Sequence, residues 1–133
     1  LTRRKPSSFE QDDIEFGWNI AKQMGGLDVG QSVTVRDRTI LAVEAIEGTD
    51  ACIMRTGQIC RRGGFTLVKV AKPDQDMRFD LPTIGPQTIE KMALAGGKAI
   101  AIEAGKTIVI DREKTIRCAE ENGIAILCRE AKN

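Results

Sequence analysis

Basic side chains are concentrated in residues 69–82, a stretch that begins at the end of an apolar segment and finishes at a proline. Lys69 and Lys72 could neutralise phosphate oxygens as point charges. Arg78 could hold the same oxygens in a two-pronged hydrogen bond. These residue types therefore indicate a phosphate site at the end of a strand. Surface ion pairs in a loop are the alternative explanation.

The same stretch also supplies carboxylates for catalysis. Asp76 or Asp80 could bind a divalent cation or orient a water molecule. The chain contains no histidine, which excludes Ser-His and Cys-His nucleophile pairs and histidine-containing zinc sites. Carboxylates, lysines and water must carry any chemistry, and this set suits hydrolysis of a phosphoanhydride.

The loop Glu47-Gly48-Thr49-Asp50 is a second candidate, between an expected strand and an expected helix. Thr49 or Asp50 is expected to be the N-cap residue, and the helix N-terminus behind it would attract an anion. Ligands of α/β sheets bind beyond the carboxyl ends of strands, so this loop and residues 69–82 would face one cleft if their strands run parallel. The alternative is a capping turn that binds no ligand.

A third candidate is the run from Glu103 to Thr107, which contains Gly-Lys-Thr. It lacks the earlier glycine of a phosphate-binding P-loop and precedes a strand rather than a helix, so we reject that interpretation. We expect a hairpin turn with Lys106 directed toward the cleft. No dinucleotide fingerprint is present elsewhere, which argues against such a cofactor.

Composition limits the classes of protein further. The chain has 133 residues and a net charge of +1, without the broad basic field that would suggest a nucleic acid partner. No apolar run approaches the roughly 20 residues that cross a bilayer. The four cysteines show no Cys-x-x-Cys spacing and are expected to be structural thiols in a reducing compartment.

The elements that must position these residues alternate between helix and strand. In the first half, Asp37-Arg38 is expected to form a tight turn between two antiparallel strands, and Asp12 and Asp13 to match the dipole at the start of a helix. The expected elements are a helix over 9–24, strands over 32–36 and 39–45, a helix over 51–60 and a strand over 65–71.

In the second half, Pro86 stands near the first turn of an expected helix. The expected elements are a helix over 86–95, strands over 99–103 and 107–110, a helix over 112–122 and a strand over 124–128. The pattern predicts an α/β fold with a mixed sheet, helices packed in two or three layers, and β-hairpins. Residues 1–8 are expected to be a linker or a strand arriving from a missing N-terminal domain, and residues 9–133 a single C-terminal α/β domain.

Several runs taken in order resemble the C-terminal domain of the LpxI family of UDP-2,3-diacylglucosamine pyrophosphatases. The runs are 13–17 (DIEFG), 42–50 (AVEAIEGTD), 68–73 (VKVAKP), 75–76 (QD), 78–80 (RFD), 82–85 (PTIG) and 103–107 (EAGKT). The resemblance extends from about Ser8 to Cys128. It implies a bacterial, magnesium-dependent enzyme of lipid A biosynthesis that hydrolyses UDP-2,3-diacylglucosamine to UMP and 2,3-diacylglucosamine 1-phosphate.

The resemblance also assigns residues and partners. It implies that Asp76 is the essential carboxylate, with Asp80 as the second choice, and residue chemistry makes Asp76 a metal ligand or a base that orients water. The residues implied to bind the substrate or line its cleft are Lys69, Lys72, Gln75, Arg78, Glu47, Thr49 and Asp50. Lys106 is added to the substrate contacts because the turn expected there would direct it toward the cleft. The implied partners are the lipid-linked UDP-sugar and an N-terminal domain of the same enzyme, in the cytoplasm. Peripheral contact with the inner membrane and formation of a homo-oligomer stay open.

Two other classes of function fit the same residues. A non-catalytic module could recognise a nucleotide-sugar or a phospholipid headgroup without hydrolysing it. In a structural protein, the charged stretch would instead make contacts between subunits.

Overall fold

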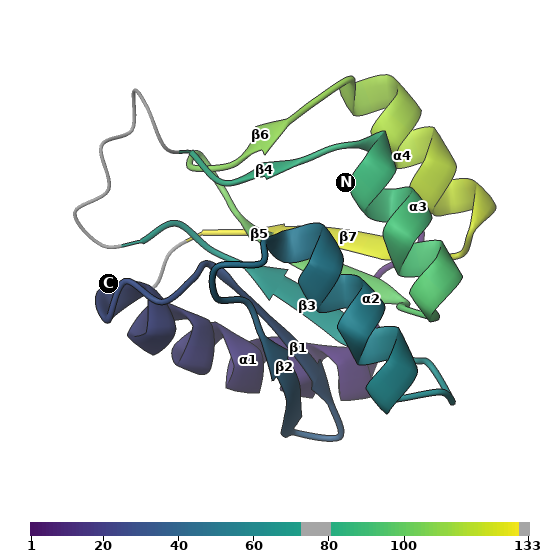
Figure 1. Ribbon diagram of the computed structural model, residues 1–133. Coiled ribbons are helices and arrows are strands. Elements are labelled where there is room, and N and C mark those ends of the chain that lie inside the picture. Colours follow the sequence, from purple (N-terminus) through teal and green to yellow (C-terminus); the bar gives the residue numbers. More distant parts are fainter. Residues whose placement is uncertain (73–80, 131–133) are drawn as a thin grey trace.

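The computed structural model describes residues 1–72 and 81–130. The main sheet has five strands in the order β2-β1-β3-β5-β7, and a second sheet pairs the short strands β4 and β6 (Figure 1). The strands are β1 (Ser32–Arg36), β2 (Thr39–Val43), β3 (Thr66–Lys69), β4 (Thr83–Ile84), β5 (Ala99–Glu103), β6 (Ile108–Val109) and β7 (Ala125–Arg129).

Helices cover both faces of the main sheet. They are α1 (Ser8–Gly26), α2 (Thr49–Ile59), α3 (Pro86–Ala95) and α4 (Arg112–Glu121). Helix α1 packs on β1 and β3, whereas α2, α3 and α4 lie side by side on the opposite face (Figure 1). The predicted α/β class with a mixed sheet and a β-hairpin is therefore confirmed, with three layers.

Each face of the sheet has its own apolar core. On the α1 face, Ile14, Trp18 and Ala21 recur at helical spacing and are buried against strand valines. Gly17 brings α1 close to the sheet, because a Cβ atom there would lie 2.7 Å from Cγ2 of Val35. The other core consists of Ile53, Phe65, Leu67, Ile84, Ile89, Met92, Ile100, Ile102, Ala119, Ile124 and Ile126.

Strand directions bring four carboxyl ends to one edge of the main sheet. Strand β1 is antiparallel to both β2 and β3, so β2 and β3 run in the same direction. Strands β5 and β7 continue parallel to β3. The loop after β2 and the chain leaving β3 thus emerge at this carboxyl edge, which meets the condition under which the sequence placed them at one cleft. The opposite edge, where β1 turns into β2, is called the amino edge below.

The hairpin of β1 and β2 turns at the predicted Asp37-Arg38 pair, both of which have positive φ. Its support comes from α1, since the carboxylate of Asp13 accepts hydrogen bonds from the backbone N–H groups of Asp37 (3.2 Å) and Arg38 (2.8 Å). Asp12 forms an exposed ion pair with Arg38. Both aspartates therefore serve the hairpin, a role that the dipole interpretation did not predict.

Two local expectations were wrong. Strand β6 does not form a hairpin with β5, because β3 and β7 already occupy both sides of β5; it pairs with β4 instead. Neither Thr49 nor Asp50 caps α2, because the helix begins at Thr49 after Gly48, whose φ of 88° suits glycine.

The first residues lie against the last strand. The N-terminal ammonium group of Leu1 donates to the carbonyl of Ile126 (2.9 Å), and the backbone N–H of Ile126 donates to the hydroxyl of Thr2 (3.0 Å). Helix α1 then begins with a capping box between Ser7 and Glu10. Within residues 1–72 and 81–130, no helix combines the length and apolar character needed to cross a membrane.

Candidate functional site

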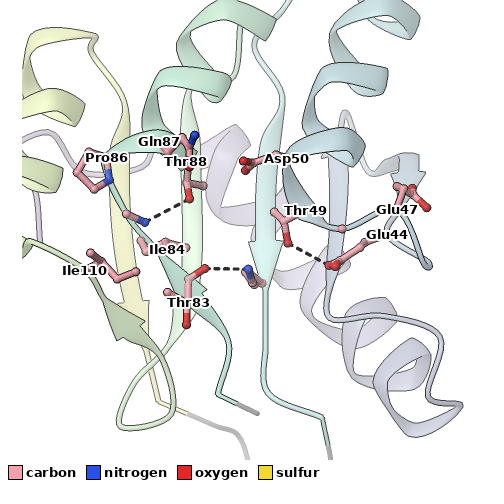
Figure 2. A pocket seen from close by; sticks show the side chains of 13 residues that line it. Glu44, Glu47, Thr49, Asp50, Thr83, Ile84, Pro86, Gln87, Thr88 and Ile110 are labelled. Atoms are coloured by element: carbon pink, nitrogen blue, oxygen red, sulfur yellow. Dashed lines mark hydrogen bonds between the residues drawn. The ribbon is translucent and has the colours of Figure 1, made fainter. Parts of the chain in front are cut away.

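A cavity of about 580 Å³ opens at the carboxyl edge of the main sheet (Figure 2). It lies among the end of β3, the loop after β2, the start of α3 and the β4-β6 pair. The lining residues are Glu44, Glu47, Gly48, Thr49, Asp50, Lys69, Thr83, Ile84, Gly85, Pro86, Gln87, Thr88 and Ile110.

Two helix N-termini meet at this cavity. Helix α2 follows Gly48 and α3 follows Gly85, and neither glycine has a side chain that could bond the first-turn N–H groups. Pro86 occupies the first position of α3, as predicted. Because helix N-termini carry partial positive charge and present backbone donors, this end of the cavity favours an anion.

Lys69 adds a full positive charge. It is the last residue of β3, is only 8% exposed, and its Nζ donates to the carbonyl of Thr83 (2.8 Å). Burial lowers the pKa of Lys69, and the carboxylates of Glu44 and Asp50 oppose this effect. The cavity therefore contains a desolvated ammonium group that a further anion would stabilise.

Glu44 and Thr49 form a polar wall on the side of the β2 loop (Figure 2). The hydroxyl of Thr49 donates to Oε1 of Glu44 (3.1 Å) and lies 3.3 Å from the hydroxyl of Ser32. Glu44 was not among the residues predicted for the site. A polar residue directly after an apolar strand, next to the loop already selected, was the signal that could have identified it.

Glu47 lies at the rim of the cavity with its charge already paired. Its carboxylate accepts from Arg55 (2.5 Å), and its pKa is lowered by a hydrogen bond to its own backbone and then by Arg55. Glu47 therefore helps to fix the shape of the loop after β2, and it also adds a negative charge to the cavity.

The structure gathers only some of the predicted site residues. Lys69, Glu47, Thr49 and Asp50 line one cavity. Lys72 instead forms an ion pair with Asp28 (2.8 Å). The remaining predicted residues within 73–80 are Asp76, Asp80, Gln75 and Arg78, which lie outside the described residues.

Lys106 does not line this cavity. Its Nζ lies 3.7 Å from Oε2 of Glu103, a fully buried carboxylate at the end of β5. Two hydrogen bonds to the carbonyl of Glu103 hold the turn around Lys106, one from the backbone N–H of Lys106 (3.3 Å) and one from the hydroxyl of Thr107 (2.9 Å). The expectation that Lys106 faces the cleft depended on the hairpin that did not form.

Fold and cavity together define a three-layer α/β domain with a site of mixed charge at the carboxyl edge of a mixed sheet, where Lys69 and two helix N-termini lie beside acidic side chains. Residues 1–127 match the family model of the LpxI C-terminal domain, and the chain belongs to this family, as its motifs predicted. It is 41% identical over 135 residues to the UDP-2,3-diacylglucosamine pyrophosphatase LpxI of Caulobacter vibrioides. The match covers 96% of this chain and 48% of the relative, so the chain spans about half the length of that curated relative.

Proposed function

We propose that this chain forms the C-terminal part of an enzyme that hydrolyses UDP-2,3-diacylglucosamine to UMP and 2,3-diacylglucosamine 1-phosphate in bacterial lipid A biosynthesis. Family membership and the activity named for the Caulobacter relative support the substrate. The observation that carries the proposal for this chain is the cavity in which Lys69 and the N-termini of α2 and α3 converge. That arrangement suits the negative charge of a diphosphate.

In this proposal, Lys69 and the first-turn N–H groups of α2 and α3 bind phosphate oxygens. They stabilise the charge that develops there while water adds to one phosphorus and the bridging P–O bond breaks. Asp76 orients that water or holds a metal ion, with Asp80 as the second choice. Lys72, Gln75, Arg78 and Lys106 stay proposed substrate contacts.

A magnesium ion is part of the proposal. Within the described ranges, no group of three or more His, Cys, Asp or Glu side chains could hold a metal ion. Mg²⁺ commonly uses one or two carboxylates together with substrate phosphates, and Glu44 and Asp50 offer carboxylates beside the proposed phosphate position. These carboxylates therefore fit a magnesium site that the substrate phosphates would complete. We assign Asp76 to the same site as a further ligand. Bound there, the ion would supply charge neutralisation at the phosphate oxygens.

The N-terminal half of the enzyme is a proposed partner that completes the site for the acyl chains. A diacylated substrate places the reaction at the cytoplasmic surface of the inner membrane, where the protein would bind peripherally.

The proposal is tested by Asp76→Ala in the complete protein that carries this chain. UMP release from UDP-2,3-diacylglucosamine with magnesium is expected to fall by about 10³-fold or more, as removal of a catalytic carboxylate does. Asp76→Asn separates the charge of the side chain from its shape. Wild-type turnover in Asp76→Ala would refute the assignment, and ligand binding without any hydrolysis in the unmutated protein would favour a non-catalytic module.

A further inference from the structure

Loops at the amino edge carry an excess of positive charge. The segment before α1, the turn of the β1-β2 hairpin and the loop between α2 and β3 contain six Lys or Arg residues but one carboxylate, that of Asp37. The six cations are all exposed, and they are Arg3, Arg4, Lys5, Arg38, Arg61 and Arg62. The whole chain has a net charge of only +1, so the rest of it is acidic and this edge is its positive end.

A groove opens at this edge between the hairpin and the end of α2. Its volume is about 490 Å³, and among the described residues it is lined by the guanidinium groups of Arg36, Arg61 and Arg62 and by one carboxylate, that of Asp37. Arg36 is held in place because it donates to the carbonyl of Gly63 (2.7 Å). Guanidinium groups bind phosphate oxygens through paired hydrogen bonds, so the groove suits an anion of this kind.

Capping of α2 does not account for Arg61 and Arg62. Cations that follow a helix often bond its last carbonyls, and both residues follow the end of α2. Within residues 1–72 and 81–130, however, neither side chain donates to a carbonyl or pairs with a carboxylate. The helix is closed instead by the backbone N–H of Cys60, which donates to the carbonyl of Thr56. Both guanidinium groups therefore keep their donors for a partner.

Two exposed apolar side chains accompany these cations. Phe9, in the first turn of α1, is 77% exposed, and Ile59, the last residue of α2, is 56% exposed. The start of α1 and the end of α2 lie on the same side of the molecule, away from the N-termini of α2 and α3 (Figure 1). Phe9 shares a shallow hollow with Arg38, and Ile59 lines the groove with Arg61 and Arg62.

We propose that the amino edge is a docking surface for an anionic lipid bilayer, in which Arg61 and Arg62 bind headgroup phosphates and Phe9 and Ile59 insert among the headgroups. Exposed cations beside aromatic and aliphatic side chains are the composition by which proteins bind such a surface. Duplex nucleic acid would attract the same cations, but its sugar-phosphate backbone gives Phe9 and Ile59 no apolar partner.

Docking by this edge leaves the cavity at the carboxyl edge free for the rest of the enzyme. The proposed function asks for a membrane location without assigning a surface to it. The charges and exposed side chains of the amino edge, by contrast, are independent of any activity.

The test measures cosedimentation of the complete protein with lipid vesicles. Vesicles of phosphatidylcholine that contain about one third phosphatidylglycerol should bind the protein at least about tenfold more tightly than phosphatidylcholine alone. Raising the salt from about 0.1 to about 0.5 M should weaken this binding, because screening shortens the range of the attraction.

Variants locate the binding surface. Arg61→Gln combined with Arg62→Gln should weaken binding to the anionic vesicles by about 30-fold, since each cation near such a surface contributes about fivefold in affinity. The matched control, Arg112→Gln with Lys114→Gln, removes the same charge from exposed residues in the first turn of α4 and should stay within about twofold of wild type. Ile59→Ser should weaken binding by about tenfold and leave its salt dependence unchanged.

Four results would overturn the inference. They are equal binding to both kinds of vesicle, wild-type binding by the Arg61 and Arg62 double variant, an equal loss in the control, and binding of inorganic phosphate or duplex DNA in calorimetry without binding of vesicles. No UMP release is measured in this experiment. Its failure would therefore leave the proposed hydrolysis standing, and failure of the hydrolysis would leave the docking surface standing.

Discussion

Charged side chains at the two edges of the main sheet have different surroundings. At the amino edge, both oxygens of Asp13 accept backbone hydrogen bonds from the hairpin turn, and Arg36 donates to the carbonyl of Gly63 (2.7 Å). At the carboxyl edge, Lys69 borders an open cavity and Glu103 keeps one oxygen without a hydrogen bond among the described residues. Saturated polar groups specify the fold, whereas buried charges that retain capacity for a ligand or an added contact indicate function.

The sharpest way to break this comparison is Lys69→Met in the complete protein. Loss of the buried ammonium group should lower kcat/KM for UMP release by about 100-fold, the usual effect of removing one preorganised donor to developing charge. The free energy of unfolding should change little, because a desolvated charge is removed together with its hydrogen bond to Thr83. Steady-state kinetics and urea unfolding measure the two effects.

Lys98→Met is the control for that variant, since Lys98 is exposed and precedes β5 at the amino edge. It should leave both kcat/KM and stability near wild type. If Lys69→Met kept full activity, Lys69 would have no part in binding the diphosphate.

Asp13→Ala, at the amino edge, should lower stability and leave activity unchanged, the reverse of the result expected for Lys69→Met. Two N–H groups of the hairpin turn lose their acceptor, so the free energy of unfolding should fall by about 2 kcal/mol while kcat of the folded enzyme stays unchanged. Arg38→Gln, which removes only the exposed ion pair with Asp12, should cost less than about 1 kcal/mol. Equal losses in the two variants would contradict a special role for Asp13.

The smallest effect is a pH dependence of stability that comes from Lys69. Burial places its folded pKa below its ordinary value of 10.5, so between these two values the unfolded chain binds more protons. Stability contributed by this site therefore rises as pH increases through that window. Urea midpoints near pH 8 and pH 10 should show this gain for the wild type relative to Lys69→Met.

The pH dependence must be measured relative to Lys69→Met, because ionisation of Cys52 makes stability fall as pH increases. Burial raises the pKa of this thiol to about 11 from 9.0, so the unfolded chain ionises first and stability falls over that range. Both proteins contain Cys52, and its contribution cancels in the difference. A wild type that lost stability relative to Lys69→Met would show that Lys69 is not destabilised in its charged form.

Local patterns in the sequence determined the helices, the β1-β2 hairpin and the family of this protein. Apolar periodicity predicted the four helices of the described ranges near their observed bounds, and the hairpin formed at Asp37-Arg38, since these features depend on neighbours within a few residues. The family was evident from motifs, and Lys69, Glu47, Thr49 and Asp50 proved to share a cavity because β2 and β3 run parallel, as that prediction required.

Only the tertiary structure decided which distant groups meet. The pairing of β6 with β4 rather than β5 depends on which sheet edges are already occupied, and no local pattern records that. Glu103 belonged to a run selected for its Gly-Lys-Thr, yet its partners are Lys22, 81 positions away, and the backbone of Ala71. Burial of a carboxylate and the identity of the groups that compensate for it are set by packing across three elements, so spacing along the chain could not reveal them.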